Sequence, residues 1–259
     1  MLPALHDTGS GEAVLFLHAF TLDASQWDHQ VAALSDHLRC VRADLWGCGA
    51  SPPPPEGEPT LDAFAAAVLA ALDSRNIERV AVVGLSMGGY LAFALWRLAP
   101  QRISALVLCN TRATADAAGS RDERLAMAEQ VEREQSVESI VEPMVARLLS
   151  PGAQAEAHIV DPVRGRIRRC TPAGIAFAQR AIAARPDSTA LLASITVPAL
   201  VIAGAKDAVI PTSEVLAIAD GIPGARYVEL DCGHVSNLEV PRAVNEQIAG
   251  FLIPARMAP

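Results

Sequence analysis

Short runs of continuous apolar residues alternate with amphipathic stretches along the chain as far as Cys109. A run without polar interruptions is typical of a strand that is buried on both faces, as in a parallel sheet. The third run, which reads RVAVVG, is also rich in the β-branched residues that favour strands. We therefore predict four strands in this part of the chain, at residues 13–20, 38–45, 79–84 and 103–109.

The stretches between these runs have the spacing of helices. In the clearest of them, Leu61, Phe64 and Val68 recur at intervals of three and four residues, which places them on one face of a helix. Thr60, directly before this face, is suited to cap the helix. The predicted helices cover residues 23–34, 60–72 and 86–98. Because strand and helix alternate, we predict an α/β fold with a mostly parallel, doubly wound sheet.

The pattern changes after residue 113, because no later apolar run as far as residue 185 resembles a buried strand. The intervening segment has helical stretches at residues 122–134, 137–149 and 173–184. The alternation then resumes, with strands expected at 196–203 and 226–230 and helices at 212–219 and 241–252. We therefore predict one core domain, made of residues 1–113 and 186–259, that is interrupted by a helical insertion at residues 114–185.

The composition, with 51% hydrophobic and 19% charged residues, supplies a full core and excludes wholesale disorder. The net charge of -8 argues against polyanionic partners, so we expect neither nucleic acid nor a membrane surface to bind. No apolar stretch reaches the roughly 18 residues that a membrane span needs. The first residues also lack the basic and apolar regions of a secretory signal.

The cysteines indicate a reducing compartment. Their number is odd and no two of them form a C-x-x-C pair, which is typical of neither a disulfide framework nor a zinc site. We therefore expect free thiols, no metal and a cytoplasmic location. The sequence leaves open whether the chain forms a homo-oligomer. The cysteines are Cys40, Cys48, Cys109, Cys170 and Cys232.

Residues 84–88 form a G-x-S-x-G pentapeptide between a predicted strand and a predicted helix. A serine in such a sharp turn adopts strained backbone angles and projects its hydroxyl from the carboxyl edge of the sheet. Gly84 and Gly88 suit the turn, because it brings the backbones of strand and helix together. A glycine-rich turn with a capping serine is the alternative for the bare pentapeptide. In this strand–turn–helix context we identify Ser86 as the candidate nucleophile.

A serine hydroxyl needs a base that removes its proton. His234 follows a predicted strand and precedes the last helix, so we expect it at the same sheet edge as Ser86. Asp207 follows the preceding strand, where a carboxylate can hold the imidazole in the tautomer that accepts the serine proton. Asp231 and Glu229 are rival acids, but they are too close to His234 in sequence to be preferred.

The negative charge that develops on the substrate oxygen also needs hydrogen-bond donors. We expect the backbone N–H groups of Met87, at the start of a helix, and Phe20, on the loop after the first strand, to form this oxyanion hole. His18, at the start of the same loop, is expected to brace the loop rather than to transfer protons.

Together these features resemble the α/β-hydrolase fold family from Gly11 to Leu252, outside the insertion. The resemblance is carried by His18-Ala19-Phe20, Asp44 to Ser51, Gly84 to Gly89, Gly204 to Asp207 and Gly233-His234. Ala19 departs from the family pattern, since relatives usually have glycine there. The stretch IPGARYVELDCGHVSNLEVP is similar to that of 3-oxoadipate enol-lactonases and small bacterial carboxylesterases.

This resemblance implies that the chain hydrolyses a small-molecule carboxylic ester or lactone without a cofactor. It also implies that residues 114–185 form a helical cap over the active site. Carboxylesterase activity is the main expectation, and enol-lactone hydrolysis is the first alternative. Thioester hydrolysis, carbon–carbon bond hydrolysis, perhydrolysis and non-catalytic ligand binding use the same scaffold and stay open.

Four residues are candidates for contacts with the substrate. Trp27 and Trp46 are expected on loops near the active edge, where they could line the pocket. Arg164 and Arg168 belong to an arginine cluster in the insertion, from which one side chain could pair with a substrate carboxylate. The competing interpretations are ordinary packing for the tryptophans and a solvated helix face for the arginines.

Overall fold

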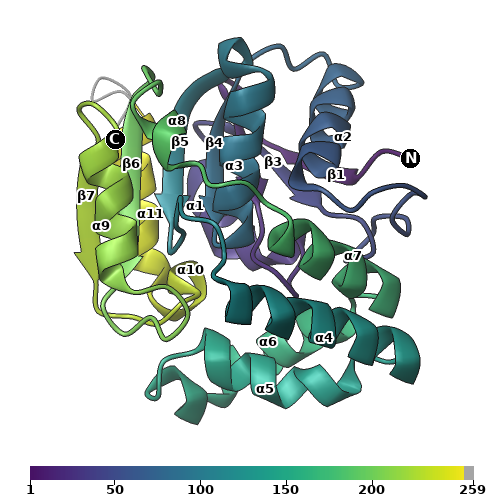
Figure 1. Ribbon diagram of the computed structural model, residues 1–259. Helices are drawn as coiled ribbons and strands as arrows, with labels where there is room; N and C mark the ends of the chain where they lie inside the picture. The colour runs from purple at the N-terminus through teal and green to yellow at the C-terminus, as the bar shows by residue number, and fades with distance from the viewer. Residues whose placement is uncertain (254–259) are drawn as a thin grey trace.

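A seven-stranded sheet forms the centre of the molecule (Figure 1). The computed structural model describes residues 1–253. The strands are β1 (Ala4–Thr8), β2 (Ala13–Leu17), β3 (Arg39–Asp44), β4 (Val80–Leu85), β5 (Ile103–Cys109), β6 (Ala199–Gly204) and β7 (Arg226–Leu230). Their order is β1-β3-β2-β4-β5-β6-β7, and all neighbours are parallel except β1 and β3. The predicted α/β fold with a mostly parallel sheet is confirmed.

Every residue of β4 and β6 is buried, because helices cover both faces of the sheet. β1 was not predicted. Its sequence, ALHDT, lacks a continuous apolar run, and the strand is only partly buried at the edge of the sheet. It pairs antiparallel with β3, in a register that sets Ala4 opposite Asp44. The formation of such an edge strand depends more on pairing with its neighbour than on the hydrophobic pattern of its own sequence.

Five of the core helices lie within their predicted ranges or within two residues of them, whereas the short helices α8 and α10 were not predicted. α2 packs on α3, α3 lies against β2, β4 and β5, and α1 packs on α11. The side chain of Thr60 accepts a hydrogen bond from the N–H of Ala63 at 3.1 Å, as expected of an N-cap. The core helices are α1 (Asp28–Leu34), α2 (Leu61–Asp73), α3 (Met87–Leu98), α8 (Thr189–Leu192), α9 (Thr212–Gly221), α10 (Ser236–Glu239) and α11 (Pro241–Leu252).

The insertion is helical and gathers at one end of the molecule (Figure 1). Its helices are α4 (Ala118–Glu134), α5 (Glu138–Leu148), α6 (Ala157–Arg168) and α7 (Pro172–Ala183). α4 packs along α7, and α5 packs on α6. No range was predicted for α6, which has Pro162 in its interior, a residue that usually interrupts helices. Within residues 1–253, no helix has the length and apolarity needed to cross a membrane.

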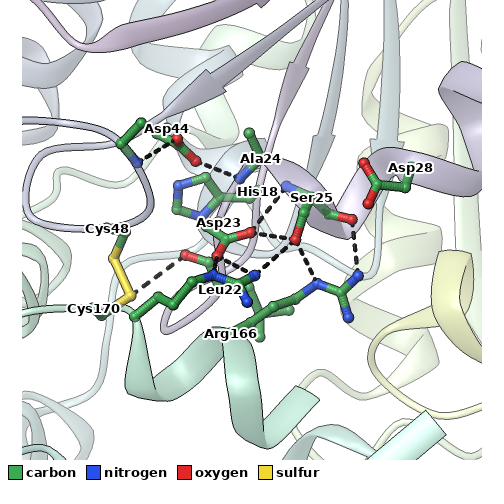
Figure 2. A network of polar contacts seen from close by, with 12 residues as sticks. His18, Leu22, Asp23, Ala24, Ser25, Asp28, Asp44, Cys48, Arg166 and Cys170 are labelled. Carbon is green, nitrogen blue, oxygen red and sulfur yellow. Dashed lines mark hydrogen bonds and ion pairs between the residues drawn. A yellow bond between two sulfur atoms is a disulfide. The ribbon is translucent and has the colours of Figure 1, made fainter. Parts of the chain in front are cut away.

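A disulfide joins Cys48, which follows β3, to Cys170, which lies between α6 and α7 (Figure 2). The expectation of five free thiols is therefore wrong for this pair. The two residues are 122 positions apart, and only the fold brings them together. Cys40, Cys109 and Cys232 are free and buried, and burial raises the pKa of the Cys40 thiol to about 11.

Hydrogen bonds beside the disulfide attach the insertion to the core (Figure 2). Arg166 of α6 donates to the hydroxyl and the carbonyl oxygen of Ser25, at 3.0 and 2.9 Å. The N–H of Thr171 donates to the carbonyl of Gly47 at 2.6 Å. Gly47 has a φ of 75°, and a Cβ there would lie 2.4 Å from Cα of Gly174. The two segments therefore meet backbone to backbone, which a larger residue at Gly47 would prevent.

Candidate active site

Ser86 occupies a sharp turn between β4 and α3, with a φ of 56°. Its N–H donates to the carbonyl of Cys109 at 2.9 Å, which fixes the turn to the neighbouring strand. A Cβ on Gly84 would lie 2.3 Å from the carbonyl oxygen of Gly88, and a Cβ on Gly88 would lie 2.1 Å from that of Leu17. The structure therefore requires glycine on both sides of the serine, as the pentapeptide indicates, and holds Ser86 in a strained conformation typical of functional sites.

His234 and Asp207 meet on the loops that follow β7 and β6. Nδ1 of His234 lies 2.8 Å from Oδ2 of Asp207, and both side chains are 1% exposed. Oδ1 of Asp207 accepts hydrogen bonds from the N–H groups of Val209 and Ile210, at 2.7 and 3.0 Å. Because an ionised carboxylate only accepts, the proton of the imidazole belongs on Nδ1, and Nε2 is left free to accept one.

Asn110 is a member of the site that sequence reasoning missed. Its Nδ2 donates to Oδ2 of Asp207 at 3.0 Å and to the carbonyl of Gly233 at 3.3 Å. Burial alone would raise the pKa of Asp207, but the His234 ring and the donors of Ile210 and Asn110 outweigh it and hold the pKa below its ordinary value. Asp207 is therefore ionised at neutral pH. The available signal was a polar residue directly after the buried strand β5.

Glu239, in α10, fixes the loop that carries His234. It accepts a hydrogen bond from the N–H of Gly233 at 2.9 Å. It also accepts from the N–H and the hydroxyl of Ser150, at 2.9 and 2.6 Å. Ser150 follows α5, so a single carboxylate connects the histidine loop to the insertion. No motif in the sequence distinguishes Glu239.

Phe20 and Met87 are the residues whose N–H groups are expected to form the oxyanion hole, and the structure places both beside Ser86. Met87 is the first residue of α3, Phe20 is on the loop after β2, and both line the same cavity as Ser86. Within residues 1–253, neither backbone N–H donates to a protein acceptor. Two N–H groups without protein partners beside a candidate nucleophile are suited to stabilise an oxyanion.

His18 braces the loop before Phe20. Its Nε2 accepts a hydrogen bond from the N–H of Leu45 at 3.0 Å, so its Nδ1 is the donor to the carbonyl of Ala19 at 2.8 Å. Burial lowers the pKa of His18. The ring is therefore neutral, uses both of its nitrogens to hold the loop, and is not free to transfer protons, in line with the expectation from the sequence.

A cavity is lined by Ser86 and His234 and by side chains of α4, α5 and α7. Arg124 of α4, Arg147 of α5 and Gln179 of α7 supply its polar wall. Its other lining residues are mainly apolar: Phe20, Met87, Tyr90, Met127, Met144, Leu148, Ile182 and Val209. A larger cleft of about 680 Å³ lies between α6 and the core, but no residue of the predicted triad lines it. The smaller cavity is therefore the candidate substrate site.

The structure does not bring the two tryptophans to this cavity. Trp27 is fully buried, and its ring centroid lies 5.3 Å from that of Phe16. The ring centroid of Trp46 lies 4.9 Å from that of Phe64, in a stacked arrangement, and 5.7 Å from that of Phe177, in an edge-to-face arrangement. Neither tryptophan lines the cavity, so the suggestion that they contact the substrate is wrong. Both pack, and Trp46 does so between the core and α7.

Arg164 and Arg168 also lie away from the cavity. Arg164 pairs with Glu142 at 2.6 Å, and Arg168 pairs with Glu138 at 2.5 Å, on a partly exposed face of α6. The structure favours the solvated-face interpretation of these two residues over the suggestion that they bind substrate. The arginines that do line the cavity come from α4 and α5, where the sequence analysis singled out none.

The chain is similar to known hydrolases over most of its length. A family model described as the alpha/beta hydrolase family matches residues 14–247. The 3-oxoadipate enol-lactonase 2 of Acinetobacter baylyi is 29% identical over 241 residues, which cover 93% of this chain and 88% of that protein.

Solved structures give the same result. A thermophilic esterase from Thermogutta terrifontis, solved with malate bound, has a TM-score of 0.92 and 36% identity, and the match covers 96% of this chain and 92% of the esterase. The enol-lactonase from Burkholderia xenovorans LB400 has a TM-score of 0.89 and 31% identity, over 97% of this chain and 96% of the lactonase.

Proposed function

We propose that this chain, which belongs to the alpha/beta hydrolase family, cleaves a carboxylic ester through an acyl-enzyme on Ser86. The observation that carries the proposal is the buried pair of His234 and Asp207, 2.8 Å apart, whose histidine lines the same cavity as Ser86. A serine that only caps a helix would need neither a strained φ of 56° nor a buried acid–base pair beside it.

In the proposed acylation step, Oγ of Ser86 attacks the carbonyl carbon of the ester while Nε2 of His234 accepts the serine proton. The N–H groups of Met87 and Phe20 donate to the oxyanion that forms. The carbon–oxygen bond of the ester then breaks, and the imidazolium gives its proton to the departing alkoxide. Water then attacks the acyl-enzyme while His234 accepts its proton. The bond between the acyl carbon and Oγ breaks, the acid is released, and the imidazolium returns the proton to Oγ of Ser86.

Asp207 serves this cycle as a positioning residue. Its carboxylate keeps the proton of His234 on Nδ1 and stabilises the imidazolium while the serine proton resides there. The N–H groups of Val209 and Ile210 hold the carboxylate in place, so no reorientation is needed during turnover.

Enol-lactone hydrolysis is the second candidate, and the enol-lactonases among the similar proteins favour it. In a lactone the alkoxide stays tethered to the acyl group after the ring opens. The steps at Ser86 and His234 are the same for both substrates, so the difference between them lies in what the helical cap, residues 114–185, admits. The cap itself is part of this proposal. Its support is the contribution of α4, α5 and α7 to the cavity wall.

A hydrolysis panel tests the proposal. It contains ethyl esters from acetate to octanoate, a lactone, a dicarboxylic monoester and an acyl thioester, each followed by acid release in a pH-stat. We expect ester turnover that falls on the order of 10⁴-fold or more in Ser86→Ala, with an unchanged circular dichroism spectrum. Turnover of the lactone alone would favour the second candidate. Full ester activity in Ser86→Ala would overturn the assignment of the nucleophile.

A further inference from the structure

The wall of the cavity that faces the triad carries positive charge and no negative charge. Arg124 and Arg147 line it, whereas no aspartate or glutamate does so among residues 1–253. The chain as a whole has a net charge of -8, so its long-range field repels anions. The wall opposite the triad therefore carries charge of the opposite sign to the net charge of the protein, and α4 and α5 supply it.

The charge on Arg124 is one of three that share a single buried carboxylate. Asp116 pairs with Arg112 at 2.5 Å, with Arg124 at 2.5 Å and with Arg185 at 2.8 Å, and its side chain is 0% exposed. Arg185 also lies over the ring of Tyr90, which lines the cavity, at 4.2 Å from the ring centroid. These three guanidinium groups outnumber the carboxylate that they share, and Asp187 lies close enough to Arg185 to offset one of them.

Arg147 is the group that could touch a ligand directly. It is exposed and lines the cavity between Met144 and Leu148 of α5, which line it as well. Within residues 1–253 it forms no ion pair. Other arginines of the insertion do form one: Arg164 with Glu142, Arg168 with Glu138 and Arg180 with Glu132. An arginine without a partner at an active-site cavity has all its donors available, and its planar fork matches a carboxylate.

We propose that Arg147, supported by the charge of Arg124 and its cluster, selects substrates that carry a carboxylate away from the bond that is cleaved. This inference rests on the proposed ester hydrolysis at Ser86 and names its substrate class: monoesters of dicarboxylic acids. The apolar residues Met127, Met144 and Leu148 accommodate the methylene groups between the two ends of such a molecule.

Two esters of similar length separate this selection from general reactivity. Monoethyl glutarate carries the carboxylate, and ethyl pentanoate is its neutral counterpart. We expect kcat/KM of the wild-type protein to be at least about tenfold higher for the charged ester, as for a charge-assisted hydrogen bond at a partly exposed site. In Arg147→Gln we expect the ratio of the two values to fall by about tenfold, mainly through KM for the charged ester.

Arg164→Gln is the matched control. It removes the same charge from the neighbouring helix of the insertion, at a position outside the cavity, and is expected to leave the ratio within about twofold of wild type. Raising the salt concentration should lower the preference of the wild-type protein and leave Arg147→Gln little changed. A wild-type preference for ethyl pentanoate, or equal losses for both esters in Arg147→Gln, would overturn the inference.

A binding measurement keeps this inference separate from the proposed function. Ser86→Ala should bind monoethyl glutarate in calorimetry more tightly than ethyl pentanoate, and the double variant Ser86→Ala, Arg147→Gln should lose that difference. If no ester or lactone is hydrolysed but this pattern is found, the proposed function fails and the anion selectivity stands. If esters are hydrolysed but Arg147→Gln does not change the difference in affinity between the two esters, the inferred selectivity is wrong and the proposed function stands.

Discussion

Asp207→Asn changes the proposed triad with a minimal change in volume. Oδ1 of Asp207 accepts hydrogen bonds from the N–H groups of Val209 and Ile210, so asparagine keeps these bonds only if its single oxygen faces them. The amide NH₂ group then faces Nδ1 of His234, which lies 2.8 Å from the replaced atom. A donor at this place moves the imidazole proton to Nε2. In that tautomer His234 cannot accept the proton of Ser86.

The size of the effect follows from this geometry. A triad histidine held in the wrong tautomer costs about 10⁴-fold in kcat, which corresponds to about 5.5 kcal/mol at 1.36 kcal/mol per factor of ten. The fold should tolerate the change, because the two backbone hydrogen bonds persist. The donor of Asn110 that now faces the new amide is left without an acceptor, and such a loss costs about 1–3 kcal/mol of the free energy of unfolding.

The assay is kcat for p-nitrophenyl butyrate at neutral pH, combined with urea unfolding of the same preparation. Asp231→Asn is the matched control. It removes the same charge close to His234, but from a carboxylate that is 78% exposed and pairs with Lys206 at 2.7 Å. We expect less than a twofold change in its kcat. A kcat of Asp207→Asn within tenfold of wild type, in a folded protein, would refute the assignment of Asp207.

Two further predictions concern stability. Replacing Cys48 and Cys170 by serine, or adding dithiothreitol, should lower the free energy of unfolding by about 5 kcal/mol, because the disulfide closes a loop of 122 residues. An unchanged urea midpoint would mean that the bond does not form in solution. Asp116 has its pKa lowered to about 2, since its arginine partners outweigh the effect of burial. The ionised carboxylate should therefore add about 2 kcal/mol to the free energy of unfolding above pH 4, and this contribution should disappear toward pH 2. In urea titrations, Asp116→Asn should be less stable than the wild-type protein at neutral pH and should lack this loss in acid.

The sequence was most informative where a local pattern and the fold agree. The sequence pattern predicts six of the strands, five of them as apolar runs, and helical spacing places α2, α3 and α11 within one or two residues of their observed bounds. The residues of the predicted triad each follow a strand of a parallel sheet. Because the carboxyl ends of such strands share one edge, the topology alone was enough to bring Asp207 and His234 together.

Features that depend on contacts between distant segments could not be predicted. β1 pairs through its backbone with β3, and Cys48 meets Cys170 only after the insertion has packed on the core. Asn110 is distinguished by a hydrogen bond to Asp207 rather than by a motif. The sequence analysis also selected the wrong arginines of the insertion. The orientation of the helices relative to the core decides which side chains reach the cavity, and sequence spacing does not determine that orientation.

The most direct test of the central claim is covalent labelling of Ser86 with a fluorophosphonate, followed by intact-mass analysis and peptide mapping. The proposed mechanism predicts a single adduct on Ser86 that is absent from Ser86→Ala and forms much more slowly in Asp207→Asn. A folded protein that hydrolyses esters but carries no adduct on Ser86, or carries it on another residue, would contradict the account.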